Sequence, residues 1–553
     1  MGFLATNKVH EVTTEAFRGG SFLLLGNASS TIILALGAIL IARLLGPEAY
    51  GTYSLSLIPS SLFLIFTDFG IDAAVTKFTA NGRPEDRKRR ARRLIRLALL
   101  FKAITAAAMV LLCLSLSEKL ATNLLNRPEI EPLIRLSVLL IPAQALANTA
   151  SYAFLASDKA EYSALVMNIQ ALVKTLSASI LVLLGLGVLG AVSGVVLGYA
   201  AAGTAAMLAL YHLHFRNKDR HKEESTDDLR FRRMMVYGFP LFISAVLATV
   251  LTQYQGIVLS HLATDTDIGN LQVSTQFMAL TSVIASAMPA LFPAFAKLQQ
   301  EDINRLFRTA TKYSAILVVP TATAIAVLSK DLIYTIYGSS YSIAPILLSM
   351  QVVTFLYAGI GSLVVGQLLS GVGETRLILK ANLLNLVVYL PLAPLLVTRL
   401  GVIGAVLAGV TTSLLSTAYQ LFSIHRKLQV SINLPDSART YLASAVSVLP
   451  TIVFLRLSTL NSFMNVVFGG SMFLATYLTT MPLLGVLHAG DIDLLSSIIA
   501  RFRAGPLLKP ILLYLAKLAE ISPTRKKQSQ IHVPQLHVKQ EPQRLRMANP
   551  DNQ

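Results

Sequence analysis

The chain alternates long apolar stretches with short polar ones. About 20 mostly apolar residues cross a bilayer as a helix. A helix also satisfies its own backbone hydrogen bonds, as lipid requires. The pattern therefore predicts an all-α polytopic membrane protein with about fourteen transmembrane helices. The predicted spans are 20–45, 51–72, 94–117, 133–156, 162–185, 188–212, 236–262, 270–296, 311–329, 343–370, 378–398, 401–424, 440–458 and 464–487.

The composition agrees with this interpretation. The mean hydropathy is +0.61 and 14% of residues are charged, against about 25% in soluble proteins. The net charge of +18 would suggest a nucleic-acid partner in a soluble protein. Here the basic residues gather in short loops between spans, which indicates membrane orientation instead. We therefore expect membrane lipids, and no nucleic acid, as partners.

The charges in the loops predict which side of the membrane each loop occupies. Basic residues cluster in 77–96, 216–233, 297–312 and 426–439, which fall on one side if the span count is right. Positive residues favour the cytoplasmic side, so we expect both termini in the cytoplasm and an even number of spans. The opposite loops carry acidic residues: Glu48, Glu118, Glu129, Glu131, Asp265, Asp267 and Asp331.

A tight turn is predicted between the first two spans, in the stretch "IARLLGPEAYGTYSLS". Pro47 cannot continue a helix, and Gly46 tolerates a sharp turn. The two spans therefore form a hairpin with its turn on the outer side. We expect Gly46 and Gly51 to tolerate bulky side chains poorly.

Two sequence matches indicate an internal repeat. "GVLGAV" at 187–192 returns as "GVIGAV" at 401–406, an offset of 214 residues, and Gly51 aligns with Gly269 at an offset of 218. Duplication of a six-span unit would give two parallel lobes with a binding site between them. The alternative is chance similarity between apolar, glycine-rich helices.

The whole pattern predicts seven regions. The C-terminal ones include amphipathic helices on the membrane surface and a polar, proline-containing tail. The regions are a cytoplasmic N-terminus (1–16), a first six-helix lobe (17–213), a basic linker (214–235), a second six-helix lobe (236–427), two further helices (438–488), interfacial amphipathic helices (489–520) and a disordered cytoplasmic tail (521–553).

The first hairpin also carries a family resemblance. "IARLLGPEAYGTYSLSLIPSSLFLIFTDFGIDAAVTKF" resembles the signature of polysaccharide-biosynthesis flippases in the multidrug/oligosaccharidyl-lipid/polysaccharide exporter superfamily. The resemblance implies transport of a lipid-linked oligosaccharide from the inner to the outer leaflet. Relatives often carry an acidic residue in the seventh span, where this chain has Gln253 and Gln255. That difference leaves the coupling ion open.

Charged residues deep in a membrane are functional candidates because their insertion costs about 2.5–3.5 kcal/mol or more. Lys174 lies near the middle of the fifth span, where its charge suits the pyrophosphate of a lipid-linked sugar. The alternative is a structural pairing within the bundle. Arg43, near the outer end of the first span, is a second candidate, although its side chain could snorkel to the interface.

Asp68 and several neutral amides complete the predicted substrate site. Asp68 could hold a cation or proton or pair with a base in the cavity, or it could cap a helix and pair with Lys77. Lys102 lies about two turns inside the basic loop and is predicted to snorkel. The amides of Gln255, Gln276 and Asn382 could bind sugar hydroxyls or join helices.

No feature of the sequence predicts catalysis. We find no Walker loop and no paired catalytic carboxylates, and the single cysteine, Cys113, excludes an internal disulfide or a cysteine metal site. We therefore expect a non-enzymatic flippase of the plasma membrane that works by alternating access, without metal or cofactor. Its substrate would be a polyprenyl-pyrophosphate oligosaccharide, and glycan-assembly proteins are possible partners. A cation-coupled multidrug exporter and a membrane enzyme of glycan assembly are the alternatives.

Overall fold

The computed structural model describes residues 2–80, 84–157, 159–215, 227–285, 295, 300–487, 491–492 and 505–521. Within these ranges the regular structure is helical throughout, which confirms the predicted all-α class. The chain forms two compact units, Met1–Phe473 and Leu474–Gln553. The larger unit holds both halves of the helical bundle described below.

We use N-terminal half for the helices up to α9 and C-terminal half for α10–α18. The helices of the N-terminal half are α1 (Gly2–Ser56), α2 (Ile58–Ile65), α3 (Ile71–Ala80), α4 (Pro84–Ser115), α5 (Ser117–Lys119), η1 (Leu120–Leu124), η2 (Pro128–Ile130), α6 (Glu131–Ser137), α7 (Leu140–Ala156), α8 (Ala160–Leu181), η3 (Val182–Leu186), α9 (Gly187–Leu210) and η4 (Tyr211–Phe215).

The C-terminal half is also built from helices, and further helices come after it in the chain. They are α10 (Asp227–Leu262), α11 (Asp265–Ala285), α13 (Gln300–Ile336), α14 (Ala344–Gln351), α15 (Val353–Leu356), η6 (Tyr357–Ile360), α16 (Ser362–Gly371), α17 (Thr375–Leu400), α18 (Val402–Leu428), α19 (Leu434–Leu457), α20 (Ser462–Leu483) and α22 (Gly505–Ile521).

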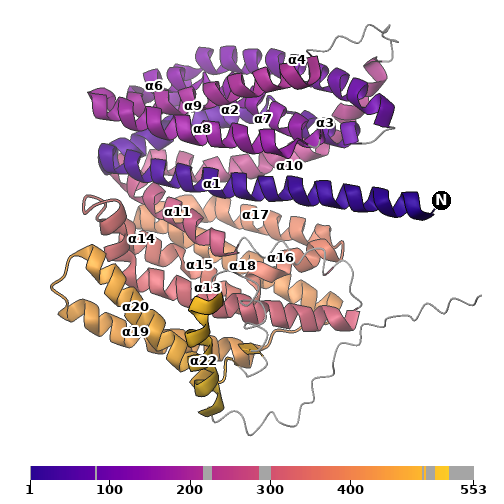
Figure 1. Ribbon diagram of the computed structural model, residues 1–553. Helices are drawn as coiled ribbons and strands as arrows, with labels where there is room; N and C mark the ends of the chain where they lie inside the picture. Colours follow the sequence, from indigo (N-terminus) through magenta and orange to yellow (C-terminus); the bar gives the residue numbers. More distant parts are fainter. Residues whose placement is uncertain are drawn as a thin grey trace, which may run out of the picture. The chain divides into compact units, whose positions relative to one another are not determined.

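Helix α1 lies on the side of the N-terminal half that faces the C-terminal half. It packs against α8 of the N-terminal half and against α11 of the C-terminal half. Figure 1 shows the helices up to α9, in indigo and purple, gathered apart from α11–α18, in magenta to orange. Helix α10 contacts both groups, through α3 on one side and α17 on the other. The fold therefore has two helical groups that meet mainly along α1, α10 and α11.

The helices are long and apolar enough for a membrane. Among the described residues, ten helices meet the length and hydropathy expected of a span, and a bent pair, 344–360 with 362–371, raises this to eleven. Large apolar side chains are also exposed at many positions, among them Leu184 at 73% and Leu457 at 78%. A soluble monomer rarely exposes so much apolar surface, whereas lipid covers it. The chain is a multi-pass membrane protein.

The chain reverses direction near Gly46. This residue has φ 75° and ψ 174° inside the long α1 helix, which breaks the helical path. In a straight helix Ala38 and Ser61 would be about 34 Å apart, yet both line one small cavity. The predicted hairpin between the first two spans is therefore confirmed, and it brings both of its arms to the same cavity.

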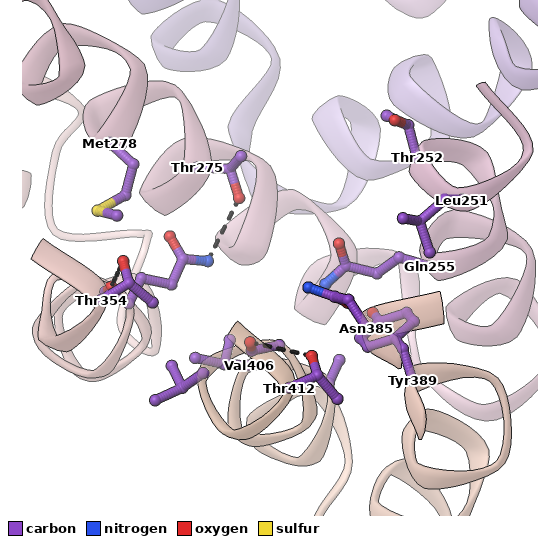
Figure 2. A pocket seen from close by; sticks show the side chains of 14 residues that line it. Leu251, Thr252, Gln255, Thr275, Met278, Thr354, Asn385, Tyr389, Val406 and Thr412 are labelled. Atoms are coloured by element: carbon purple, nitrogen blue, oxygen red, sulfur yellow. Dashed lines mark hydrogen bonds between the residues drawn. The ribbon is translucent and has the colours of Figure 1, made fainter. Parts of the chain in front are cut away.

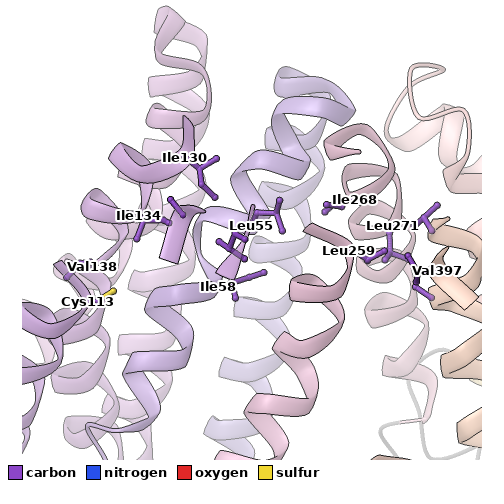
Figure 3. Close-up of a cluster of buried hydrophobic side chains, with 14 of the residues drawn as sticks. Leu55, Ile58, Cys113, Ile130, Ile134, Val138, Leu259, Ile268, Leu271 and Val397 are labelled. Atoms are coloured by element: carbon purple, nitrogen blue, oxygen red, sulfur yellow. The ribbon is translucent and has the colours of Figure 1, made fainter. Parts of the chain in front are cut away.

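An apolar cluster joins the two halves beside this hairpin. Leu55 and Ile58 from the N-terminal half pack with Leu259 and Leu271 from the C-terminal half, and all four side chains are buried (Figure 3). The same cluster includes Cys113, which is a free, buried thiol. The cluster holds the hairpin against α10 and α11, the helices that line the cavities described below.

The smaller unit contains the end of α20 and helix α22. The hydroxyls of Thr479 and Tyr514 lie 3.0 Å apart and join these two helices. Helix α22 falls almost wholly within 489–520, where interfacial amphipathic helices were predicted. Of the other predicted regions, most of 489–504, nearly all of the tail predicted to be disordered (521–553) and half of the basic linker (214–235) lie outside the described residues.

Candidate functional site

A cavity of about 240 Å³ lies between the two halves. Helices α1 and α2 supply hydroxyl and apolar side chains, including Tyr50, Tyr53 and Ser54, and α8 supplies Lys174. From the other half, α10 and α11 supply amides. The amides are those of Gln253, Gln272 and Gln276.

Lys174 is the one charged residue among the described residues that line this cavity. It makes no ion pair or hydrogen bond with any residue that the structure describes. A close approach of α9 fixes its position on α8, because a Cβ at Gly198 would lie 2.6 Å from the Cβ of Lys174. An unpaired cation away from bulk water attracts an anion strongly. We call this cavity the cationic cavity.

A larger cavity of about 380 Å³ lies within the C-terminal half. Helices α10, α11, α14, α15, α17 and α18 line it with neutral groups, and no charged residue lines it in the part of the chain that the structure describes. The amides of Gln255 and Asn385 end close together in Figure 2, which also labels Thr252, Thr412 and Tyr389 around the cavity. We call this cavity the neutral cavity.

A buried ionic cluster lies in the N-terminal half, away from both cavities. Lys102 Nζ is 2.9 Å from Asp68 Oδ1 and 2.9 Å from Asp72 Oδ2, and the Thr149 hydroxyl donates to Asp72 Oδ1 at 2.7 Å. The side chain of Lys102 is only 1% exposed. The prediction that Lys102 snorkels is therefore wrong, because two carboxylates satisfy its charge within the bundle.

Asp68 also caps the N-terminus of α3. Its carboxylate accepts the backbone N–H groups of Gly70 at 3.1 Å and Asp72 at 3.2 Å, as a capping residue does. Its charged partner is Lys102. Lys77, the partner considered from the sequence, instead lies over the ring of Tyr237 at 3.8 Å from its centroid.

Polar contacts join the two halves at the ends of α10 and α11. Arg127 Nε donates to Asp265 Oδ1 at 2.8 Å, and its two other nitrogens donate to the carbonyls of Ser260 and Ala263, each at 2.8 Å. The hydroxyl of Thr52 donates to the second oxygen of Asp265 at 2.7 Å. We call this group the Arg127 clasp.

Two further contacts hold α1 to the C-terminal half. The Tyr341 hydroxyl donates to the carbonyl of Ala42 at 2.6 Å, and the Arg43 guanidinium donates to the carbonyl of Thr335. Arg43 therefore lies at the junction of the halves and lines neither cavity.

Comparison with known proteins places this arrangement in a family. Residues 16–299, just over half of the chain, match the model of a family described as polysaccharide biosynthesis protein. The chain belongs to this family. No curated protein sequence matches it.

The fold of this polysaccharide biosynthesis protein recurs in solved transporters. A structure of the lipid II flippase MurJ in an inward closed conformation superposes with a TM-score of 0.67 at 16% identity, over 83% of this chain and 97% of that one. An inward-facing multidrug resistance MATE family transporter of the MOP superfamily gives 0.59 at 14% identity, over 72% and 94%. The chain therefore shares the fold of these two structures.

The fold brings together only some of the predicted site residues. Lys174 and Gln276 share the cationic cavity, and Gln255 lines the neutral cavity. Asp68 belongs to the ionic cluster, and Asn382 is exposed on α17 outside both cavities. Asn168, which lies 214 residues before Asn382 in the chain, donates to the carbonyls of Gly26 and Ala164 and so joins α1 to α8.

Sequence reasoning missed several residues of this polysaccharide biosynthesis protein. Tyr50, Tyr53 and Tyr389 line the cavities, but an aromatic residue in an apolar span carries no signal of its own. Arg127 did carry one, since it is a basic residue between acidic positions on the side predicted to be outside.

Proposed function

We propose that this polysaccharide biosynthesis protein is a flippase for a lipid-linked oligosaccharide of the polyprenyl-pyrophosphate type. The observation that carries the proposal is the unpaired Lys174 in a cavity bounded by both halves. A pyrophosphate headgroup would supply the missing negative charge. The polyprenyl chain stays in lipid while the headgroup crosses.

The sign of the cavity charge favours this substrate over a cationic drug. A drug exporter of the same superfamily would need acidic groups near its ligand. The cationic cavity instead offers Lys174 with three glutamine amides and several hydroxyls. Amides and hydroxyls can both donate and accept hydrogen bonds, so the cavity suits a hydrated, anionic headgroup. The proposal involves no bond-breaking step.

We propose fourteen transmembrane helices with both termini in the cytoplasm. The stretches 26–65 and 160–213 are 40 and 54 residues long, about twice the length that a span needs. Gly46 breaks the first and Gly187 the second. Counting each of these two stretches as two spans raises the ten candidate spans to twelve. The bent pair, 344–360 with 362–371, and helix α11 add one span each and bring the total to fourteen. The charges of the loops support the cytoplasmic termini.

We also propose that the two halves are parallel repeats, residues 17–213 and 236–427. Gly187 has φ 49° and ψ −131°, and Gly401 has φ 58° and ψ −143°. The same rare backbone conformation therefore occurs at equivalent positions of "GVLGAV" and "GVIGAV". In both motifs the second glycine packs against the preceding helix, because a Cβ there would approach its backbone more closely than 3.0 Å.

The contact between the halves supports a two-fold relation. A Cβ at Gly51 would overlap the carbonyl oxygen of Asp265, and a Cβ at Gly269 would overlap that of Pro47. The two glycines are 218 residues apart, and so are the two carbonyls. Reciprocal contacts between equivalent residues occur where two repeats meet at a two-fold axis. Rocking of the lobes about this contact would expose the cationic cavity to each side in turn.

The proposal is tested by changing the charge at Lys174. Lys174→Glu should abolish transport because it repels the phosphate, Lys174→Arg should retain part of it, and Lys174→Gln should fall between them. The measurement is a leaflet-specific assay of lipid-linked sugar in reconstituted cell-membrane lipids. Glycan-assembly proteins, which we propose as possible partners in the cell, are absent from this assay.

A matched control is Lys380→Glu, since Lys380 is exposed on α17 and lines neither cavity. This variant should transport like the unaltered protein. Equal transport by the Lys174→Glu and Lys174→Arg variants, at equal folded protein, would refute the phosphate role.

A further inference from the structure

The described residues that line the neutral cavity carry no charge but offer hydrogen-bonding groups. The side-chain amides of Gln255 and Asn385 make no hydrogen bond with any residue in the described parts of the chain. Neither amide is among the polar groups sealed from solvent, so both remain accessible from the cavity. Each amide can donate two hydrogen bonds and accept two. Left without a ligand, they would be hydrated, and a ligand with hydroxyl groups could replace that water.

The hydroxyls around these amides can contribute further contacts. Thr252 and Thr412 donate to carbonyls of their own helices, at 2.9 Å and 3.2 Å, and their oxygens can still accept. The ring of Tyr389 is buried and adds an apolar surface. Mixed donors and acceptors beside an aromatic ring match a sugar, which has hydroxyls around its edge and C–H groups on its faces.

The neutral cavity adjoins the cationic cavity. Helix α10 contributes Gln253 to the cationic cavity and Gln255 to the neutral one, and α11 contributes Gln276 and Thr275 in the same way. The two cavities therefore share α10 and α11 as walls, and Thr275 and Gln276, which are consecutive on α11, line one cavity each. A headgroup with its phosphate at one cavity could place a sugar in the other.

We infer that the neutral cavity binds an uncharged sugar of the headgroup while Lys174 binds the phosphate. This inference rests on the proposed function and adds the substrate class. A sugar carboxylate would enter a cavity whose lining includes no cation among the described residues. Burial of an unpaired carboxylate is costly, so a uronic acid should be disfavoured at this position.

The experiment compares the binding of three synthetic probes to the purified full-length protein in nanodiscs. The probes are a polyprenyl pyrophosphate without sugar, the same lipid with one neutral hexose, and the same lipid with one hexuronic acid. Kd is measured by microscale thermophoresis. The neutral hexose should tighten binding about tenfold over the bare lipid, the size expected from one to two neutral hydrogen bonds. The hexuronic acid should not tighten it.

Two variants and a matched control locate the effect. Asn385→Leu and Gln255→Leu should each remove most of the tenfold gain and leave binding of the bare lipid unchanged. Asn382→Leu is the control, because Asn382 lies three residues from Asn385 on the same helix but lines neither cavity. This control should keep the gain. Thermal unfolding verifies that each variant is folded. If Asn385→Leu does not fold, Gln255→Leu provides the test on its own.

The outcomes separate this inference from the proposed function. Lys174→Gln should weaken binding of all three lipids by the same factor. If Lys174→Gln leaves binding of the bare lipid unchanged, the phosphate role fails while the sugar gain can still be measured. If the unaltered protein binds the bare and hexosyl lipids equally, or if both leucine variants keep the full gain, the sugar site is overturned. Tighter binding of the hexuronic acid lipid than of the neutral hexose lipid would overturn the inference that the bound sugar is uncharged.

Discussion

The buried ionic cluster makes a strong prediction about stability. Lys102→Met keeps an unbranched side chain of similar length but removes the cation that contacts Asp68 and Asp72, both at 2.9 Å. Removal of one partner of a buried ion pair costs about 3–5 kcal/mol, because the other charge is left uncompensated. Asp72 is 7% exposed and should contribute most of this cost, whereas Asp68 is 34% exposed and is partly screened by solvent.

Thermal unfolding in detergent, followed by far-UV circular dichroism, measures the effect. For a helical lobe of about 200 residues, a loss of 3 kcal/mol lowers Tm by about 6–12 °C. The double variant Lys102→Met with Asp72→Asn should recover a large part of this loss, since it removes the buried charge as well. Lys380→Met serves as a control at an exposed position and should change Tm little.

Two results would refute this reasoning. An unchanged Tm for Lys102→Met would mean that water or lipid headgroups satisfy the carboxylates. A double variant as unstable as the single one would mean that the lysine stem, rather than its charge, holds α3 and α4 together.

Two further predictions concern the contact between the halves. Gly51→Ala should lower the free energy of unfolding by about 1–3 kcal/mol and reduce transport, because its Cβ would overlap the backbone of Asp265. The control Gly366→Ala, whose Cβ would meet nothing within 4 Å, should change neither stability nor transport. Equal thermal unfolding of the two variants would contradict the packing role of Gly51. Arg127→Ala removes the Arg127 clasp on Asp265. It should speed the labelling of Ser54→Cys, a position that lines the cationic cavity, by an impermeant thiol reagent added on the outer side. An unchanged labelling rate would show that the clasp does not hold this cavity closed.

The apolar pattern determined most of the fold because a membrane imposes a simple rule. A span must be long, apolar and helical, so the fold class could be predicted from composition and periodicity. The hairpin at Gly46 was also predictable, since glycine followed by proline breaks a helix wherever it occurs. Lys174 was found by its depth in a span, which depends only on its position in an apolar stretch.

The sequence could not determine which polar groups meet. The sequence predicted that Lys102 snorkels and that Lys174 lies deep in its span, yet among the described residues Lys102 is paired with two carboxylates and Lys174 with none. The difference depends on how α3 and α4 pack, and that packing joins residues about 30 positions apart. Likewise Gln255 and Asn382 looked alike as amides in apolar spans, but only Gln255 lines a cavity.

The sequence by itself therefore determined that the chain is a helical membrane protein with a hairpin at its first turn and a lysine deep in the fifth predicted span. Only the tertiary structure decided that this lysine is unpaired between two halves, that the neutral amides Gln255 and Asn385 gather in a cavity of their own, and that Arg127 joins the halves. The physical reason is that burial in lipid is set locally by each span, whereas the pairing of charges and the shape of a cavity depend on contacts between helices far apart in the chain.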